Sequence, residues 1–100
     1  MSKMQYHTNN DLSFQFTNKN GDTLFKSISF KNEEEMNGVI STLQKIPNKL
    51  KLFERKTNHE GLFLFKLKND QGQIIGTSEH YNSEAGMENG IKNIITAIEN

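Results

Sequence analysis

The sequence contains no cysteine and no tryptophan. Without cysteine the chain can form neither a disulfide nor a thiolate metal site, and catalysis by a thiolate is excluded as well. A protein without cysteine suits a reducing compartment, so we expect a cytoplasmic location.

The chain also lacks an excess of charge and any long apolar run. Twelve basic residues balance twelve acidic residues, which gives a formal net charge of zero. Such a balance provides no general attraction to nucleic acid or to an anionic membrane. No segment approaches the roughly 20 apolar residues of a membrane helix, and the first five residues lack the apolar run of a signal peptide. We therefore expect no contact with a membrane.

Apolar residues are few but regularly placed. They make up 33% of the chain and include seven phenylalanines, which favours a folded protein over a disordered one. A chain of 100 residues lies in the usual size range of one domain. We expect residues 1–100 to form a single domain.

Two segments have the apolar spacing of amphipathic helices. In the first, Asn32 is a candidate N-cap, three glutamates follow it, and Pro47, the only proline, comes after the last apolar position. In the second, Asn82 or Ser83 is the candidate cap. The apolar stripes consist of Met36, Val39, Ile40, Leu43 and Ile46 in the first segment, and of Met87, Ile91, Ile94, Ile95 and Ile98 in the second.

Alternating apolar and polar residues ahead of each helix predict strands. The pattern indicates a weak strand around Met4 and Tyr6 and stronger strands over 12–17, 24–30, 53–57, 63–68 and 74–81. Clusters of Asn, Asp and Gly separate them, as is typical of turns. Strict alternation directs Leu24, Ile28 and Phe30 toward the helices, and likewise Ile75, Thr77, Glu79 and Tyr81.

The two halves of the chain match when the second is shifted by 51 residues. Gly72 then falls on Gly21 and Ser78 on Ser27, while the apolar positions of the strands and helices coincide. Such self-similarity indicates a repeated structural unit. We predict an α+β fold of two tandem β-β-β-α repeats, at about residues 4–47 and 51–100. They form one mainly antiparallel sheet with two helices on one face, related by a pseudo-twofold.

The second half resembles the YegP-like family of small bacterial proteins. The resemblance rests on four segments, of which the first half carries a degenerate copy: residues 53–56 (FERK), 63–68 (FLFKLK), 73–81 (QIIGTSEHY) and 85–91 (AGMENGI). It implies one antiparallel-rich sheet with helices on one face and strands exchanged across the pseudo-twofold. It implies no established activity, catalytic residue or cofactor.

We find no motif for catalysis, metal binding or cofactor binding. Ser78, Glu79 and His80 are neighbours on one predicted strand, so their side chains alternate between faces and cannot form a triad. We predict that the protein is not an enzyme and has no cofactor or metal. Gly86 and Gly90 are four apart in the second helix, which favours close packing of that helix on the sheet. We expect Glu79, predicted to face the helices, to pair with Arg55.

The outer face of the sheet is the predicted partner-binding surface. Alternation places there a mixture of apolar and polar residues: Phe25, Leu64, Lys66, Lys68, Ile74, Ser78 and His80. An exposed apolar patch among polar neighbours is typical of a binding surface. We predict a non-enzymatic interaction or accessory protein that binds another protein or self-associates. The alternative is weak nucleic-acid binding through Arg55, Lys56, Lys66 and Lys68, which the zero net charge disfavours.

Overall fold

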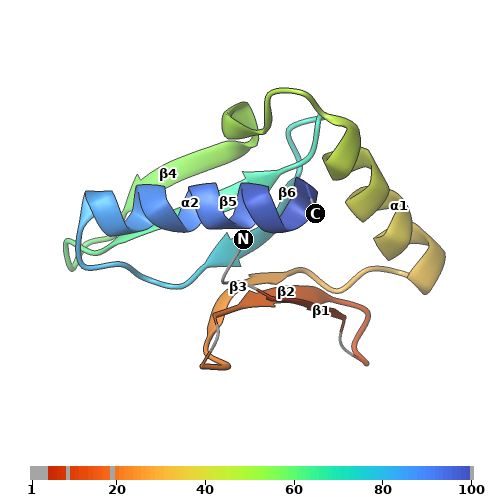
Figure 1. Ribbon diagram of the computed structural model, residues 1–100, viewed down its shortest axis with the longest axis horizontal. Coiled ribbons are helices and arrows are strands. Elements are labelled where there is room, and N and C mark those ends of the chain that lie inside the picture. Colours follow the sequence, from red (N-terminus) through yellow and green to blue (C-terminus); the bar gives the residue numbers. More distant parts are fainter. Residues whose placement is uncertain (1–4, 9, 19, 100) are drawn as a thin grey trace.

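The computed structural model describes residues 5–8, 10–18 and 20–99, and the side chains from residue 8 onward within these ranges. Two groups of three strands are each followed by a helix (Figure 1). The elements are β1 (Gln5–Thr8), β2 (Phe14–Thr17), β3 (Thr23–Ser27), α1 (Glu33–Lys45), the short 3₁₀ helix η1 (Lys49–Leu52), β4 (Phe53–Thr57), β5 (Phe63–Lys68), β6 (Ile74–Ser78) and α2 (Glu84–Glu99). Of the weak first strand that the sequence predicts, Met4 lies outside the described residues.

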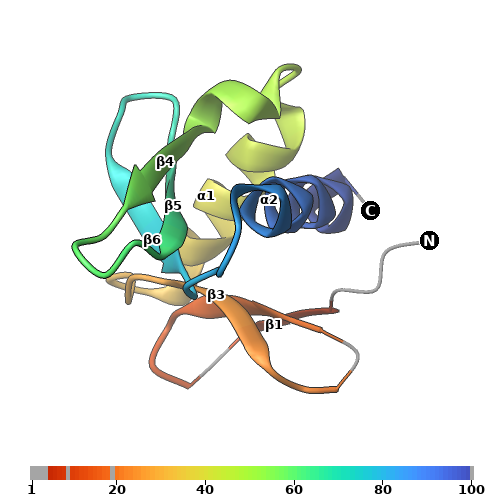
Figure 2. The same ribbon diagram turned by 90° about the vertical axis from the view of Figure 1, so that its left-hand side faces the viewer.

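All six strands belong to one antiparallel sheet in the order β1-β2-β3-β6-β5-β4. The sheet bends around the two helices, which lie together on its concave side (Figure 2). The predicted α+β class and the placement of both helices on one face are therefore correct. The strands of each half stay together, however, so the strand exchange that the family resemblance implied is wrong.

The two groups of strands meet where β3 pairs with β6. Phe25 lies opposite Ser78, Lys26 opposite Thr77, and Ser27 opposite Gly76. The ring of Phe25 crosses directly over Gly76, and a Cβ built on this glycine would lie 2.4 Å from the ring and 2.6 Å from the carbonyl oxygen of Lys26. Only glycine fits at position 76 without a shift of the backbone.

Two β-bulges change which side chains face the helices. In β3 the register shifts between Phe25 and Thr23, and Leu24 is the extra residue. In β6 it shifts between Gly76 and Ile74, and Ile75 is the extra residue. A bulge reverses the alternation on one side of it. As a result Phe25 is fully buried, although strict alternation predicted it on the outer face.

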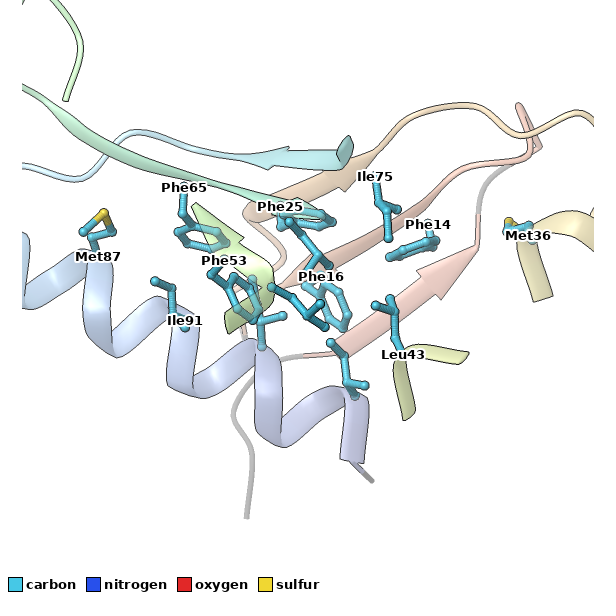
Figure 3. Packing of buried hydrophobic residues seen from close by; sticks show 14 of the residues in the cluster. Phe14, Phe16, Phe25, Met36, Leu43, Phe53, Phe65, Ile75, Met87 and Ile91 are labelled. Carbon is cyan, nitrogen blue, oxygen red and sulfur yellow. The ribbon is translucent and has the colours of Figure 1, made fainter. Parts of the chain in front are cut away.

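A layer of aromatic rings fills the space between sheet and helices (Figure 3). Phe25 stacks on Phe65 with ring centroids 6.3 Å apart, and it also contacts Phe16 at 5.8 Å. The helices cover this layer with Met36 and Leu43 from α1 and with Met87, Ile91, Ile94 and Ile98 from α2. The predicted helix stripes are thus confirmed, because these residues are buried and the other stripe residues pack against the core half-buried: Val39, Ile40, Ile46 and Ile95. The burial of these apolar side chains drives the docking of the helices.

Both helices begin at the caps that the sequence indicates. The Asn32 side chain accepts a hydrogen bond from the backbone N–H of Glu35, at 2.8 Å. Ser83 Oγ accepts one from the N–H of Gly86, at 3.0 Å. Ser83 rather than Asn82 therefore caps α2. Each cap satisfies a backbone donor that the first turn leaves free.

A buried lysine secures the connection between the two halves. Lys49 is 6% exposed, and its Nζ donates to the carbonyl oxygens of Gln44 (3.2 Å) and Ile46 (2.7 Å) at the end of α1. The Glu99 carboxylate at the end of α2 lies 3.6 Å away. A positive charge is favourable at the C-terminus of a helix, so Lys49 holds the ends of both helices to the connector.

The contact between Phe25 and Gly76 gives the first prediction. Gly76→Ala places a methyl group inside the Phe25 ring and should destabilise the protein by about 2–3 kcal/mol, the range of overpacked core variants. The matched control is Gly38→Ala on the exposed face of α1, where an added Cβ meets nothing within 4 Å. That change should stabilise the protein by about 0.5–1 kcal/mol. Urea unfolding followed by circular dichroism measures both, and equal midpoints for the two variants would contradict the proposed contact.

Candidate functional site

Two of the seven residues predicted to form the outer-face surface do not lie on that face. Phe25 is 0% exposed and Ser78 is 5% exposed, and both lie on the helix side of the sheet. Because the Ile75 bulge precedes it, Gly76 also turns inward, whereas Thr77 turns outward. Placing Phe25 and Ser78 on the outer face was therefore wrong, since strict alternation does not allow for the extra residue of a bulge.

The hydroxyl group of Ser78 forms hydrogen bonds with the backbone. Its Oγ accepts a hydrogen bond from the backbone N–H of Phe65 at 2.9 Å and donates to the carbonyl oxygen of Glu79 at 2.8 Å. Ser27 makes the same pair of bonds, accepting from Phe14 N–H and donating to the Ile28 carbonyl, both at 2.8 Å. Each hydroxyl thus satisfies a buried backbone donor where the strand ends. A serine engaged in this way is not a nucleophile.

Arg55 pairs with helix α2 and not with Glu79. Its Nε and Nη2 donate to the two carboxylate oxygens of Glu88, the second at 3.0 Å. This hydrogen bond holds the pKa of Glu88 below its ordinary value and raises the pKa of Arg55. Glu79 is exposed, as is Thr77. The predicted Glu79–Arg55 pair is therefore wrong, and so is the predicted inward position of Glu79 and Thr77.

Lysines and one glutamate occupy the uncovered face of the sheet near β4 and β5. Lys68 Nζ lies 3.0 Å from one carboxylate oxygen of Glu54, and Lys56 Nζ lies 3.5 Å from the other. The hydrogen bond from Lys68 holds the pKa of Glu54 below its ordinary value. Leu64 and Lys66 on the same strand are half-buried. This surface is basic only in part, because Glu54 offsets two of its lysines.

The histidines whose exposure is described do not belong to a metal-binding group. His80 and His59 are exposed. Across 5–8, 10–18 and 20–99 no three His, Asp or Glu residues gather closely enough to hold a metal ion. Within the same ranges no helix is long and apolar enough to cross a membrane.

Tyr81 explains one of the two glycines of α2. A Cβ at Gly90 would lie 2.4 Å from the Tyr81 hydroxyl oxygen, whereas one at Gly86 would lie 3.1 Å from the Ser83 hydroxyl oxygen and in ordinary contact with the Tyr81 ring. The packing interpretation therefore holds for Gly90, which allows the tyrosine to pack against the helix. The hydroxyl is buried without a hydrogen-bond partner among the described residues. Burial raises the pKa of Tyr81, and the Glu79 carboxylate raises it further.

An apolar groove lies between α1 and the turn that joins β5 to β6. It has a volume of about 550 Å³, and its apolar wall consists of Ile28, Phe30, Val39, Ile74 and Ile75. Ile28 is 50% exposed and Ile74 is 43% exposed, so both are large apolar side chains that the fold leaves in contact with water. Both line this groove, and the N–H of Ile28 donates to the carbonyl oxygen of Ile75, the residue after Ile74, at 2.7 Å.

The sequence predicted only part of this groove. Ile74 was expected at the surface and is exposed, whereas Ile28 was expected to be buried. The signal that could have identified Ile28 is its counterpart 51 residues later, Glu79, since an acidic residue indicates an exposed position. We take the groove at Ile28 and Ile74 as the candidate functional site.

The fold and the site define a small α+β protein with one antiparallel sheet, two helices packed on one face and an apolar surface groove. Residues 58–98 match the family model DUF1508, described as a domain of unknown function. A UPF0339 protein of Stutzerimonas stutzeri, encoded in the 5' region of the ptx operon, is 32% identical over 85 residues, covering 84% of this chain and 76% of that protein. The UPF0339 protein YegP of Escherichia coli is 30% identical over 86 residues, covering 84% and 78%.

The chain therefore belongs to the UPF0339 family, which confirms the resemblance to YegP. The solution structure of YegP from Escherichia coli, described as a protein of unknown function, aligns with a TM-score of 0.80 at 23% identity over 100% of this chain and 90% of that one. The solution structure of a UPF0339 protein from Shewanella oneidensis aligns with the same TM-score over 87% of its length. The comparisons establish family and fold, and the family is one of uncharacterised function.

The position of Ser78 gives the second prediction. Ser78→Ala removes the acceptor of a buried backbone N–H and should destabilise the protein by about 1–3 kcal/mol. The control is Thr77→Ala, one residue earlier on the exposed face, which should change the stability by less than about 0.5 kcal/mol. Chemical denaturation measures both. If Thr77→Ala costs more than Ser78→Ala, the assignment of the two residues to opposite faces is wrong.

Proposed function

We propose that the chain is a single domain, residues 1–100, built from two copies of one β-β-β-α unit, at about 4–47 and 51–100 and related by a pseudo-twofold. Several hydrogen bonds support this, because they recur at a spacing of 51 residues. The N–H of Ile28 donates to Ile75, and that of Glu79 donates to Leu24. The bonds of Ser27 and Ser78 and the caps of the two helices recur in the same way. The matching family model, at 58–98, also falls within the second unit.

This proposal makes the third prediction. If the two units are equivalent, Ser27→Ala should destabilise the protein by about the same 1–3 kcal/mol as Ser78→Ala, because each removes the acceptor of a corresponding buried N–H. The two variants are compared by urea denaturation, with Thr77→Ala as the control. A loss at only one of the two serines would argue against equivalent units.

We further propose that the protein is a non-enzymatic interaction protein of the cytoplasm and that it binds its partner at the groove of Ile28 and Ile74. One observation carries this proposal: two large apolar side chains that line the same groove are exposed, whereas their counterparts 51 residues away are the polar Glu79 and Thr23. Exposed apolar residues that occur singly need no explanation. A cluster in a groove is typical of a binding surface.

Nucleic-acid binding is the second candidate. It is supported by Lys56, Lys66 and Lys68, which share the uncovered face of the sheet. Arg55 lies on the other face in its pair with Glu88, and Glu54 offsets Lys56 and Lys68. The phenylalanines with described burial are buried or half-buried on the helix side, so none provides the stacking platform that single-stranded nucleic acids use. We therefore rank this candidate below the protein partner.

The fourth prediction tests the groove. The double variant Ile28→Ser, Ile74→Thr should lose at least tenfold in affinity for the native partner captured from the source organism, because it removes both apolar anchors. Each residue is largely exposed, so the variant should unfold within about 1 kcal/mol of the parent. The control is Leu50→Ser, which changes an equally exposed apolar residue (50%) of η1.

Quantitative pull-down followed by titration of the purified partner provides the measurement. Equal affinity of the double variant and the parent would refute the groove as the binding site. If Leu50→Ser weakens binding as much as the double variant does, the loss of affinity would reflect the removal of any exposed apolar side chain and not the groove itself.

A further inference from the structure

The charges around the groove indicate what kind of segment it receives. This inference rests on the function proposed above and concerns the chemistry of the partner. Glu35 lines the groove beside Val39, one turn apart on α1. Glu33 and Glu34 precede it in the first turn and are exposed. The groove thus has an apolar wall, and Glu35 is the charged residue among those that line it.

A second carboxylate lies near the groove, at the turn between β5 and β6. Asp70 borders a smaller hollow that shares Val39 and Asn69 with the groove. The cations near these elements are Lys31 before α1 and Lys68 at the end of β5. Lys68 lies directly opposite Ile74 in the β5–β6 ladder, and its ammonium group is paired with Glu54. Among the described residues the carboxylates of Glu35 and Asp70 form no ion pair, whereas the charge of Lys68 is offset by Glu54.

The remaining polar groups of the groove are already engaged. The Asn69 side-chain oxygen accepts from the N–H groups of Gln71 and Gln73, each at 2.9 Å, and its amide nitrogen donates to Gln73 Oε1 at 2.8 Å. These amides hold the turn in shape. A ligand would find apolar surface on the floor and negative charge at the margin, with few directional hydrogen bonds available.

We propose that the groove binds a cationic segment of a partner protein: an aliphatic or aromatic residue inserts between Ile28, Val39 and Ile74, and flanking Lys or Arg residues face Glu35 and Asp70. Charge complementarity of this kind raises the association rate and selects among partners. A second copy of this chain is disfavoured as the occupant. A symmetric contact through the groove would bring the glutamates of both copies together.

A selection from a phage-displayed library of random dodecapeptides tests the proposal. It is run in parallel on the intact protein and on the double variant Ile28→Ser, Ile74→Thr. We expect peptides enriched on the intact protein alone to carry an apolar residue flanked by Lys or Arg. Their binding, measured by fluorescence anisotropy, should weaken at least tenfold in the double variant and should weaken with rising salt.

Glu35→Gln tests the charge separately. It should weaken binding of the selected peptides about three- to tenfold, whereas Glu60→Gln, an exposed carboxylate in the hairpin between β4 and β5, should leave binding unchanged. Thermal unfolding of both variants verifies that the fold is retained. The two variants remove one negative charge each, so the comparison isolates the position of the charge.

The outcomes separate the inference from the function on which it rests. Groove-dependent peptides that are neutral or acidic, or equal effects of Glu35→Gln and Glu60→Gln, would overturn the cationic partner and leave the groove as a binding site. Peptides that bind parent and double variant alike, or no selected peptides at all, would overturn both proposals. Light scattering that shows a dimer of the parent and a monomer of the double variant would identify a second copy as the occupant and overturn the cationic partner.

Discussion

The fold depends on the pairing of β3 with β6, where one phenylalanine ring lies across one glycine. The sheet order places this ladder between β1–β3 on one side and β4–β6 on the other. Phe25 stacks on Phe65 of β5 and contacts Phe14 and Phe16 of β2, so its ring joins the aromatic residues of both sides. Gly76 provides the space that the ring requires. The β3–β6 contact therefore joins the two groups of strands into one sheet, and it also joins their aromatic residues into one core.

The helices were predictable from sequence because their signals are local. Apolar spacing, the cap at Asn32 and the acidic first turn determined α1 almost to the residue, and the same holds for α2 with Ser83. The turns at Gly21 and Gly72 were also indicated by composition, and both glycines have positive φ angles that favour glycine. In these segments, near neighbours in sequence determine the conformation.

The faces of β3 and β6 could not be predicted in this way. A bulge depends on how two strands register against each other, and that information is not contained in one strand. Leu24 and Ile75 each add one residue to their strand, which turned Phe25 and Ser78 inward and Glu79 outward. The prediction of the candidate site was affected most, because Ile28 follows the bulge at Leu24 and its side chain was therefore assigned to the wrong face. Its exposure is visible in the sequence only through comparison with Glu79.

The register of β3 against β6 also bears on how the molecule could assemble. Residues 25, 26 and 27 pair with 78, 77 and 76, and this ladder is the contact between the two groups of strands. The same ladder can form between β3 of one molecule and β6 of another without any change in its hydrogen bonds. The segment that would have to open is the connector around Pro47 and Asn48, which Lys49 secures to both helices. An exchange of this kind would have to break the contacts of Lys49 with the ends of both helices, so the hydrogen bonds of one ammonium group add to the free-energy cost of opening the connector.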